Sequence, residues 1–485
     1  MLTRRRFVAS ATTVLVGAEL TGALAQARYS RKPGVAAEPS AGKTVAVRLD
    51  AAERPVALPC FGGHALPLWT FADGEWPPLI RLNLGDRLEA TLENHLPRAQ
   101  ESSSVHWHGL RLPNDQDGVP FLVQPPVQPG ETFRYGFTPP DPGTFFFHTH
   151  CNTAEHLGRG LVGVLIIDGD ITEPYDADRV LLLRDWQVDI ESGRFNPFFT
   201  LRGAARSGTY GPLRSVNGTV NPQLALPASG DCRLRLINTD TTRIMQIGVQ
   251  GADAAIIAVD GMALPPFPLA SWTLGPGMRV DIVLRAPGEG RIARLIDQSP
   301  PGHVELAHFI GQGVARRMTA FDPAPLRAAR IAEPDMKSAE RLNFVFQSSE
   351  SGQFIGDASD AQGAGIGALC LSQKQFWTIN DRAWPDRDHA RLPAPLAVLR
   401  RGRSYLLSLK NDSPFAHPIH IHGHSFKLLR SNQQKTPQHH ADTLLLLPQE
   451  RAEVAFVADN PGDWMFHCHI IEHQESGMMG YFRVS

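Results

Sequence analysis

Apolar and polar residues alternate along much of the chain, and this pattern predicts β-strands joined by turns rather than long helices. Three alternating segments, each ending in Asn, look alike; they are residues 85–94, 232–238 and 404–411. Each Asn is followed at a nearly constant distance by a Pro-Gly pair, whose glycines are Gly143, Gly288 and Gly462. Three copies of one strand-and-turn pattern indicate three antiparallel sandwich or Greek-key barrel domains. Because each match is short, chance recurrence of strand patterning is the alternative explanation.

Length and composition agree with this arrangement. The 485 residues suit about three domains of ordinary size. We expect domains at residues 44–170, 171–325 and 340–485, with a linker rich in Ala, Pro and charge near residues 320–340. A hydrophobic content of 42% excludes a mainly disordered chain. The formal net charge of −2 gives no reason to expect binding to nucleic acid or to an anionic membrane.

The N-terminus has the pattern of an export signal. Three consecutive arginines, beginning at Arg4, precede a weakly apolar stretch, and the segment Ala25-Gln26-Ala27 offers small residues for cleavage. The arginines resemble those of a twin-arginine signal. We therefore expect residues 1–27 to direct the chain through the twin-arginine export machinery to the periplasm or out of the cell. A membrane anchor is the alternative, and Glu19 disfavours it by interrupting the apolar stretch, so we expect no anchor after cleavage.

Histidine is unusually frequent, with 19 residues, and its spacing suggests a metal site. On a β-strand, the two side chains of a His-x-His pair point to the same face. The chain has four such pairs: His106/His108, His148/His150, His420/His422 and His467/His469. Eight imidazoles exceed the needs of one ion, so they predict two or three metals with positions left open for a small oxygen ligand. Since the pairs fall in the first and third domains, a single site requires these two domains to touch.

Cys468 lies between two of these histidines and should face the opposite side of its strand. His417, His473 and Met478 lie at spacings that allow them to turn toward its thiolate. Two His, one Cys and a weak axial Met are the ligands of a blue electron-transfer copper site. Zinc also binds thiolate and imidazole, but it cannot change oxidation state. A single His-x-His pair is weak evidence, whereas four pairs around such a cysteine favour metal binding.

We assign ordinary roles to the other histidines and cysteines. His439 and His440 are predicted to form a solvated loop pair. Seven histidines are expected to be surface or packing residues: His64, His95, His156, His303, His308, His389 and His424. One or two disulfides can form in an oxidising compartment among the cysteines other than Cys468, with the pairing left open. These cysteines are Cys60, Cys151, Cys232 and Cys370.

Four motifs give the chain a family resemblance. The sequences HWHG, HTHC, HPIHIHGHSF and HCHIIEHQESGMM, which begin at His106, His148, His417 and His467, resemble the signature of three-domain multicopper oxidases. This is the family of laccases, bilirubin oxidases and cuprous oxidases. The resemblance covers nearly the whole mature chain and implies an all-β chain of three consecutive cupredoxin-like Greek-key domains. Residues 117–120 (DGVP) and 157–163 (LGRGLVG) look most like a bacterial branch proposed as manganese(II) oxidases.

The resemblance also implies four copper ions and their ligands. The type 1 copper would be bound by His417, Cys468 and His473, with Met478 axial, and the type 2 copper by His106 and His420. One type 3 copper would be bound by His108, His148 and His469, and the other by His150, His422 and His467. Single electrons from a reducing substrate would enter at the type 1 site and pass through Cys468 to the trinuclear cluster, where O₂ is reduced to water.

Oxygen reduction consumes protons, and two acids are expected to supply them. Asp117 matches an acid that the family places near the cluster as a proton relay, although Asp before Gly is also a common turn residue. Many bacterial relatives have Glu directly after the last type 1 histidine, where this chain has Gln474, which cannot titrate. We therefore expect Glu475 or Asp117 to serve, or turnover to be slower, and we expect Gln474→Glu to raise turnover at neutral pH.

The reducing substrate is less well specified by the sequence. Relatives specialised for cuprous ion carry a Met-rich insertion, whereas residues 351–375 contain no Met. This favours laccase-like oxidation of phenols and aromatic amines, with Mn(II) oxidation as the main alternative. A copper-free periplasmic scaffold with the same fold is a different class of function, and the presence of every ligand disfavours it. A two-domain copper nitrite reductase would not need four His-x-His pairs. The threefold repeat suggests that a monomer suffices.

Overall fold

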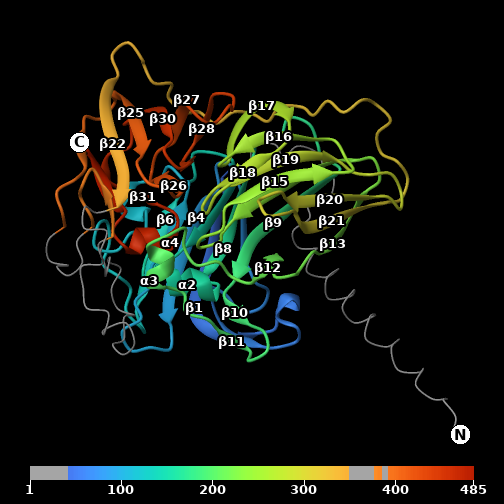
Figure 1. The fold of residues 1–485 in the computed structure, drawn as a ribbon, viewed down its shortest axis with the longest axis horizontal. Coiled ribbons are helices and arrows are strands. Elements are labelled where there is room, and N and C mark those ends of the chain that lie inside the picture. Colours follow the sequence, from blue (N-terminus) through green and yellow to red (C-terminus); the bar gives the residue numbers. More distant parts are fainter. Residues whose placement is uncertain (1–41, 349–375, 385–391) are drawn as a thin grey trace, which may run out of the picture.

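Strands dominate the protein. The computed structural model describes residues 42–348, 376–384 and 392–485, and its strands form successive pairs of sheets (Figure 1). This confirms the predicted all-β fold. The expected export signal (residues 1–27), the Met-free segment 351–375 with Cys370, and His389 lie outside the described residues.

Residues 44–168 form two four-stranded sheets, with strand orders β2-β1-β4-β6 and β3-β8-β7-β5. Burial alternates along β4, as the period of two predicts, whereas β7 and β8 are buried on both faces. The sheet that contains β5 and β7 is therefore enclosed by protein. The strands are β1 Thr44–Val56, β2 Leu66–Thr70, β3 Leu79–Asn83, β4 Arg87–His95, β5 His106–His108, β6 Thr132–Phe137, β7 Gly143–His148 and β8 Val162–Asp168.

Residues 177–312 form a second set, with a six-stranded sheet in the order β12-β9-β14-β19-β16-β17 and a five-stranded sheet in the order β13-β21-β20-β15-β18. A short ribbon of β10 and β11 projects from it. The strands are β9 Ala177–Trp186, β10 Val188–Asp189, β11 Arg194–Phe195, β12 Leu213–Val216, β13 Gln223–Pro227, β14 Asp231–Asn238, β15 Met245–Gln250, β16 Ala254–Val259, β17 Met262–Pro268, β18 Trp272–Leu274, β19 Arg279–Arg285, β20 Ile292–Asp297 and β21 Val304–Gln312.

The third set repeats this plan between residues 340 and 484, in the orders β23-β22-β25-β30-β27-β28 and β24-β32-β31-β26-β29. The strands are β22 Glu340–Ser348, β23 Trp377–Ile379, β24 Ala397–Leu399, β25 Ser404–Asn411, β26 His417–Ile421, β27 Phe426–Ser431, β28 His439–Ala441, β29 Thr443–Leu446, β30 Arg451–Val457, β31 Gly462–Cys468 and β32 Met479–Val484. The short helices among the described residues are η1 Pro59–Phe61, η2 Asn114–Gln116, α2 Thr153–Arg159, α3 Leu201–Ala204 and α4 Ile471–Glu475.

The three recurring sequence segments occupy equivalent places. They form β4, β14 and β25, and each pairs in parallel with the first strand of its set, β1, β9 or β22. The Asn that ends each segment makes the same kind of hydrogen bond. Asn94, Asn238 and Asn411 all donate from Nδ2 to backbone carbonyls beyond the strand. The repeat therefore reflects three copies of one topology.

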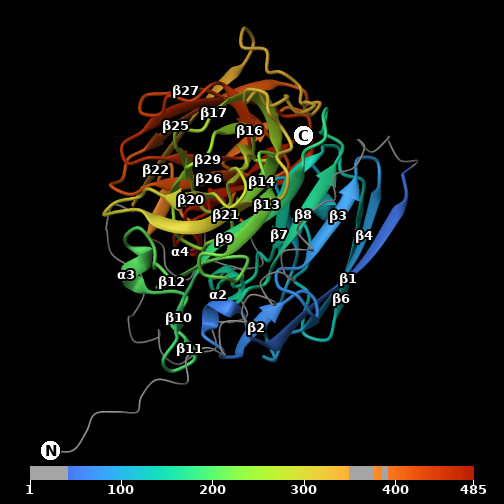
Figure 2. The ribbon, with the colours of Figure 1, turned by 90° about the vertical axis from the view of Figure 1, so that its right-hand side faces the viewer.

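The three sets lie against one another. The second and third sets share one hydrophobic core, and a separate cluster that includes Trp107 and Phe147 fills the first set. Figures 1 and 2 show the C-terminal strands (red) beside the middle strands (green to yellow), with the first set (blue) adjoining them. The first and third sets meet where the imidazole rings of His106 and His420 lie 5.9 Å apart.

Two expectations about the remaining residues are wrong. His439 and His440 lie on strand β28 rather than in a solvated loop, and His439 is buried against Trp272. No disulfide forms among the described cysteines: Cys60, Cys151 and Cys232 are buried free thiols, because they lie in different parts of the fold. Across residues 42–348, 376–384 and 392–485, we find no helix with the length and apolarity needed to cross a membrane.

Candidate metal centre

One buried cluster contains the cysteine. β26 and β31 are antiparallel neighbours that place Ile419 opposite Cys468, so that His417, at the start of β26, reaches the thiol. His473 approaches from α4. The Cys468 Sγ atom lies 3.6 Å from His417 Nδ1 and 3.7 Å from His473 Nδ1, and the two Nδ1 atoms are 3.0 Å apart. Three possible ligand atoms therefore converge on one point.

The outward nitrogens of both histidines are occupied. His473 Nε2 donates to the Arg206 carbonyl at 2.6 Å, and His417 Nε2 contacts the Ser413 hydroxyl at 2.8 Å. The ring of Trp377 packs on both imidazoles, with centroid distances of 4.8 and 5.0 Å. The hydrogen bond to a carbonyl assigns the proton of His473 to Nε2 and leaves the Nδ1 lone pair facing the thiol.

Burial makes this cluster suitable for a cation. It lowers the pKa of His473 to about 4 and that of His417 well below its usual value, and it raises the pKa of the Cys468 thiol. Both imidazoles are thus neutral at pH 7, and their Nδ1 atoms face each other at 3.0 Å beside the thiol. A thiophilic cation satisfies both nitrogens and takes the sulfur as thiolate, so these residues fit a copper ion.

Met478 is buried beside this cluster. The Cys468 amide donates to the Met478 carbonyl, and the Met478 amide donates to the His473 carbonyl, each at 3.0 Å. The chain between His473 and Met478 therefore returns to the cysteine, which keeps Met478 in the same core as Cys468.

A second cluster consists of the four His-x-His pairs. Strand register brings the pairs together, with His106 opposite His148 on β5 and β7, and His420 opposite His467 on β26 and β31. The two strand pairs then face each other across the first and third sets. The rings of His106 and His422 stack at 3.8 Å, and so do those of His108 and His420.

Five histidines of this cluster are fixed at Nδ1. His106, His148, His420, His422 and His467 bond there to backbone or carboxylate oxygens, at distances between 2.8 and 3.0 Å. Such bonds place the proton on Nδ1 and leave Nε2 as a free ligand. Several buried nitrogens have no hydrogen-bond partner among the described residues: Nε2 of His106, His148, His150, His420 and His469, and Nδ1 of His108 and His469. Unpaired buried nitrogens are costly, and metal ions satisfy them.

These free nitrogens converge in three groups, in each of which the ligand atoms lie within 4.8 Å of one another. The groups are His106/His108/His420, His106/His150/His422 and His108/His148/His469. His467 lies beside the second group, because its Nε2 is 3.1 Å from that of His422. Burial lowers the pKa of seven of the eight: His108, His148, His150, His420, His422, His467 and His469. Neutral imidazoles in this arrangement fit several copper ions.

The two acids expected to move protons lie in different places. Asp117 contacts the imidazole cluster directly, because its Oδ2 lies 2.8 Å from His422 Nδ1 and its Oδ1 lies 3.2 Å from His106 Nδ1. The Glu475 carboxylate instead accepts a hydrogen bond at 2.8 Å from the Ala154 amide, at the start of α2. Gln474 is buried. The proton-relay roles of Asp117 and Glu475 stay predictions.

Sequence reasoning missed the residues that support the cysteine cluster from the middle set. The Glu472 carboxylate, adjacent to His473, accepts from the Thr200 amide at 2.7 Å and from both the amide and the hydroxyl of Thr209. These bonds hold the segment 200–209, and with it the Arg206 carbonyl, over His473. The glutamate before the last histidine of the HCHIIEH motif was the available signal for this support. Its partners, Thr200 and Thr209, lie far away in the chain, so the sequence alone does not identify them.

Sequence reasoning also missed Asp442 and Thr443, which contact His420 from the start of β29. The Asp442 carbonyl and the Thr443 hydroxyl each lie 3.0 Å from His420 Nδ1. An Asp-Thr pair two residues after His440 was visible in the sequence, but nothing local connects it to a histidine more than twenty residues earlier.

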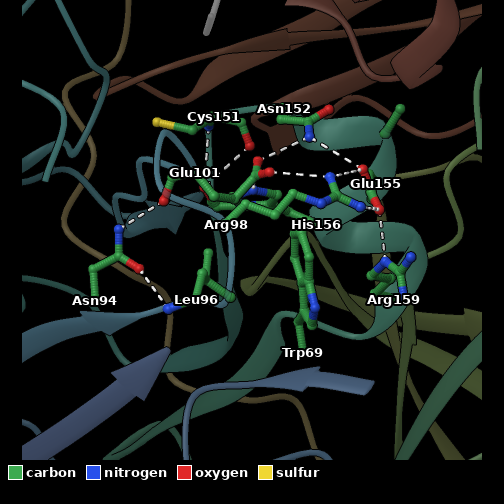
Figure 3. Close-up of polar contacts among 12 residues, drawn as sticks. Trp69, Asn94, Leu96, Arg98, Glu101, Cys151, Asn152, Glu155, His156 and Arg159 are labelled. Carbon is green, nitrogen blue, oxygen red and sulfur yellow. Dashed lines mark hydrogen bonds and ion pairs between the residues drawn. The ribbon is translucent and has the colours of Figure 1, made fainter. Parts of the chain in front are cut away.

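A polar network supports the segment that follows His150. Figure 3 shows the Glu101 carboxylate facing Asn152 and His156, with Arg98 reaching Glu155. Glu101 Oε1 lies 2.8 Å from His156 Nε2 and accepts from Asn152 Nδ2 at 2.9 Å. Both Glu101 and His156 are fully buried. Because Asn152 is two residues beyond His150, this network fixes the chain directly after the imidazole cluster.

We expect His156→Leu to destabilise the protein by about 3 kcal/mol, since a buried carboxylate loses its closest partner. The measurement is the free energy of unfolding in urea. Arg48→Ala, which breaks the exposed Arg48–Glu93 pair, is the control and should change little. Equal effects of the two substitutions would contradict a structural role for the buried pair.

Comparison with known proteins agrees with the geometry. Three sheet pairs that carry a cysteine-histidine cluster and a separate histidine cluster define a copper-dependent oxidase of three cupredoxin-like domains. Family models described as multicopper oxidase match residues 60–171, 192–291 and 371–485. The chain belongs to the multicopper oxidase family, and it is an oxidoreductase that uses copper and O₂. The copper-free scaffold alternative is not favoured.

Relatives support this membership along almost the whole chain. A multi-copper oxidase from Pseudomonas thermotolerans is 38% identical, with a TM-score of 0.79, and covers 92% of this chain and 100% of its own. The multicopper oxidase MmcO of Mycobacterium tuberculosis is 26% identical over 91% of this chain and 88% of its own length. A laccase-like multi-copper oxidase from Ochrobactrum sp. is 25% identical, with a TM-score of 0.72, over 94% and 99% of the two chains.

Proposed function

We propose that the cysteine cluster is the type 1 site and the imidazole cluster the trinuclear site, in domains spanning residues 44–170 and 340–485. His417, Cys468, His473 and Met478 would hold the type 1 copper. His106 and His420 would hold the type 2 copper, with His108, His148 and His469 on one type 3 copper and His150, His422 and His467 on the other. When bound, these four coppers collect single electrons at the type 1 site and use four of them to reduce O₂ to water.

Three consecutive residues serve both sites, and this is the observation that best supports the proposal. The Cys468 thiol points to His417 and His473, while His467 and His469 on either side point into the imidazole cluster. Alternation along β31 produces this division. Cys468 and its two peptide links thus provide a short covalent route from one site to the other.

The chain also offers a short route for electrons from the surface. His473 donates to the Arg206 carbonyl, and the Arg206 side chain is exposed. A reducing substrate that contacts the Arg206 peptide is therefore separated from the His473 imidazole by one hydrogen bond. Electron transfer by this route requires no pocket fitted to one substrate shape, which suits small phenols and aromatic amines. The Ochrobactrum relative is described as having oxidase activity towards lignin model compounds, which supports the same substrate class.

Oxygen uptake by the copper-loaded protein tests this proposal. We expect uptake with a substituted phenol, with little or none with Cu(I). Mn(II) is the third substrate in the panel, because residues 117–120 and 157–163 resemble the proposed manganese-oxidising branch. Oxygen uptake with Mn(II) but not with the phenol would contradict phenol as the substrate class and indicate a metal oxidase instead. Absence of uptake with all three, from a protein that holds copper, would contradict the oxidase proposal.

We propose further that the chain acts in the periplasm or outside the cell, as a monomer without a membrane anchor, after export by the twin-arginine machinery. The arginines at positions 4–6 and the small residues before position 28 support this proposal. Replacing all three arginines by lysine should retain the protein in the cytoplasm, as measured by cell fractionation. Unchanged export of that variant would argue for a different route.

A further inference from the structure

The middle set of strands contributes one side chain that bonds to all three sets. Arg279, the first residue of β19, is fully buried. Its guanidinium donates to Asp442 in a bidentate pair, at 2.8 and 2.6 Å. It also donates to the carbonyls of Thr144, Gly277 and Asp260, at 3.3, 3.1 and 3.0 Å. All five N–H groups are thus used, and the acceptors belong to the first, second and third sets.

Its partner Asp442 contacts two histidines of the imidazole cluster. Asp442 Oδ1 lies 3.3 Å from His420 Nδ1 and 3.4 Å from His108 Nε2. The Thr443 hydroxyl, which donates to the same carboxylate oxygen at 2.7 Å, lies 3.5 Å from His108 Nε2. A carboxylate here attracts the imidazole protons to these outward nitrogens. The inward nitrogens, His420 Nε2 and His108 Nδ1, are then free to bind metal.

The turn before Arg279 packs directly against a third histidine. A side chain at Gly277 would place its Cβ 2.7 Å from His469 Cδ2, and Gly277 has a φ of +81°. At the other side, any Cβ on Gly109, the residue after His108, would collide with the Arg279–Asp442 pair. The glycine of the HWHG motif is therefore required by a contact with the middle set.

We propose that Arg279 is a positioning residue for the trinuclear site, which acts through Asp442 to orient His108 and His420. This inference rests on the proposed ligand assignment. The middle set binds no copper through its own residues, but its Arg279 determines how ligands from the other two sets face the metal. Arginine suits this task because its planar guanidinium fixes both carboxylate oxygens, whereas a lysine ammonium would fix one.

The test compares Arg279→Met with Arg233→Met. Arg233 is a matched control, because it is also fully buried in the middle set and pairs with two carboxylates, Asp170 and Asp281, and no described hydrogen bond joins it to a histidine. Both substitutions should lower the melting temperature. Only Arg279→Met should change the electron paramagnetic resonance signal of the type 2 copper and slow oxygen uptake, by about 10- to 100-fold. Anaerobic reduction of the blue type 1 band should be unchanged in both variants.

Two further variants keep the test decisive if Arg279→Met does not fold. Arg279→Lys retains the charge without the bidentate geometry, and Asp442→Asn retains the shape without the charge; each should shift the type 2 signal. An unaltered signal in the folded variants, or an equal shift in Arg233→Met, would overturn the inference. If the parent protein itself lacks a type 2 signal, the ligand assignment fails instead, so the two failures are distinguishable.

Discussion

Cys468→Ser should abolish oxygen uptake with every reducing substrate and remove the intense blue colour, while copper stays bound in the imidazole cluster. The hydroxyl is a hard, poor ligand for copper and gives no thiolate-to-copper charge transfer. The eight histidines keep their own supports, such as the Asp117 and Asp442 contacts. We expect copper content to fall by one ion per chain.

Cys232→Ser is the matched control for this substitution. Cys232 is likewise a buried free thiol, but it lies on β14 in the middle set, and its thiol contacts the Gly230 carbonyl rather than a histidine. This variant should keep the blue band and the parent rate of oxygen uptake. Equal loss of colour in the two variants would indicate general destabilisation, and undiminished uptake by Cys468→Ser would remove the sulfur from the electron route.

Removal of copper should lower the melting temperature substantially, because the imidazole cluster joins the first and third sets. A ligand that binds only the folded state contributes about 4 kcal/mol when its free concentration is 1,000-fold above its Kd. For a large domain this corresponds to roughly 8 °C in the melting temperature. The measurement is differential scanning calorimetry before and after chelation, with recovery when copper is returned.

The Cys468→Ser variant serves as the control for this experiment as well. Since it should retain the copper ions that bridge the two sets, most of the stabilisation by copper should remain. An unchanged melting temperature after complete copper removal would contradict a cluster that bridges the first and third sets.

The sequence predicts those features that depend on local geometry. The period of two along residues 85–94 predicts β4, and the Asn-terminated repeats predict three equivalent folds, since each copy carries its own strand and turn. A His-x-His pair on a strand must present both rings to one face. This rule follows from backbone pleating alone and requires no knowledge of distant residues.

Features that depend on distant contacts could not be predicted. His439 was predicted to lie in a solvated loop, yet it is buried, with Trp272 of the middle set packed against it. Arg279 and Asp442 meet at the junction of the middle and third sets. The residues next to each in the sequence give no indication that the two side chains pair. No disulfide joins the described cysteines Cys60, Cys151 and Cys232, which lie on η1, after β7 and on β14, and composition does not reveal these places.

Anomalous diffraction at the copper edge, from crystals of the copper-loaded protein, tests the central claim most directly. The account predicts four peaks per chain. One should lie among His417, Cys468 and His473, and three should lie together between the histidines of β5 and β7 and those of β26 and β31. A single peak, or peaks bound by residues outside these two clusters, would contradict it.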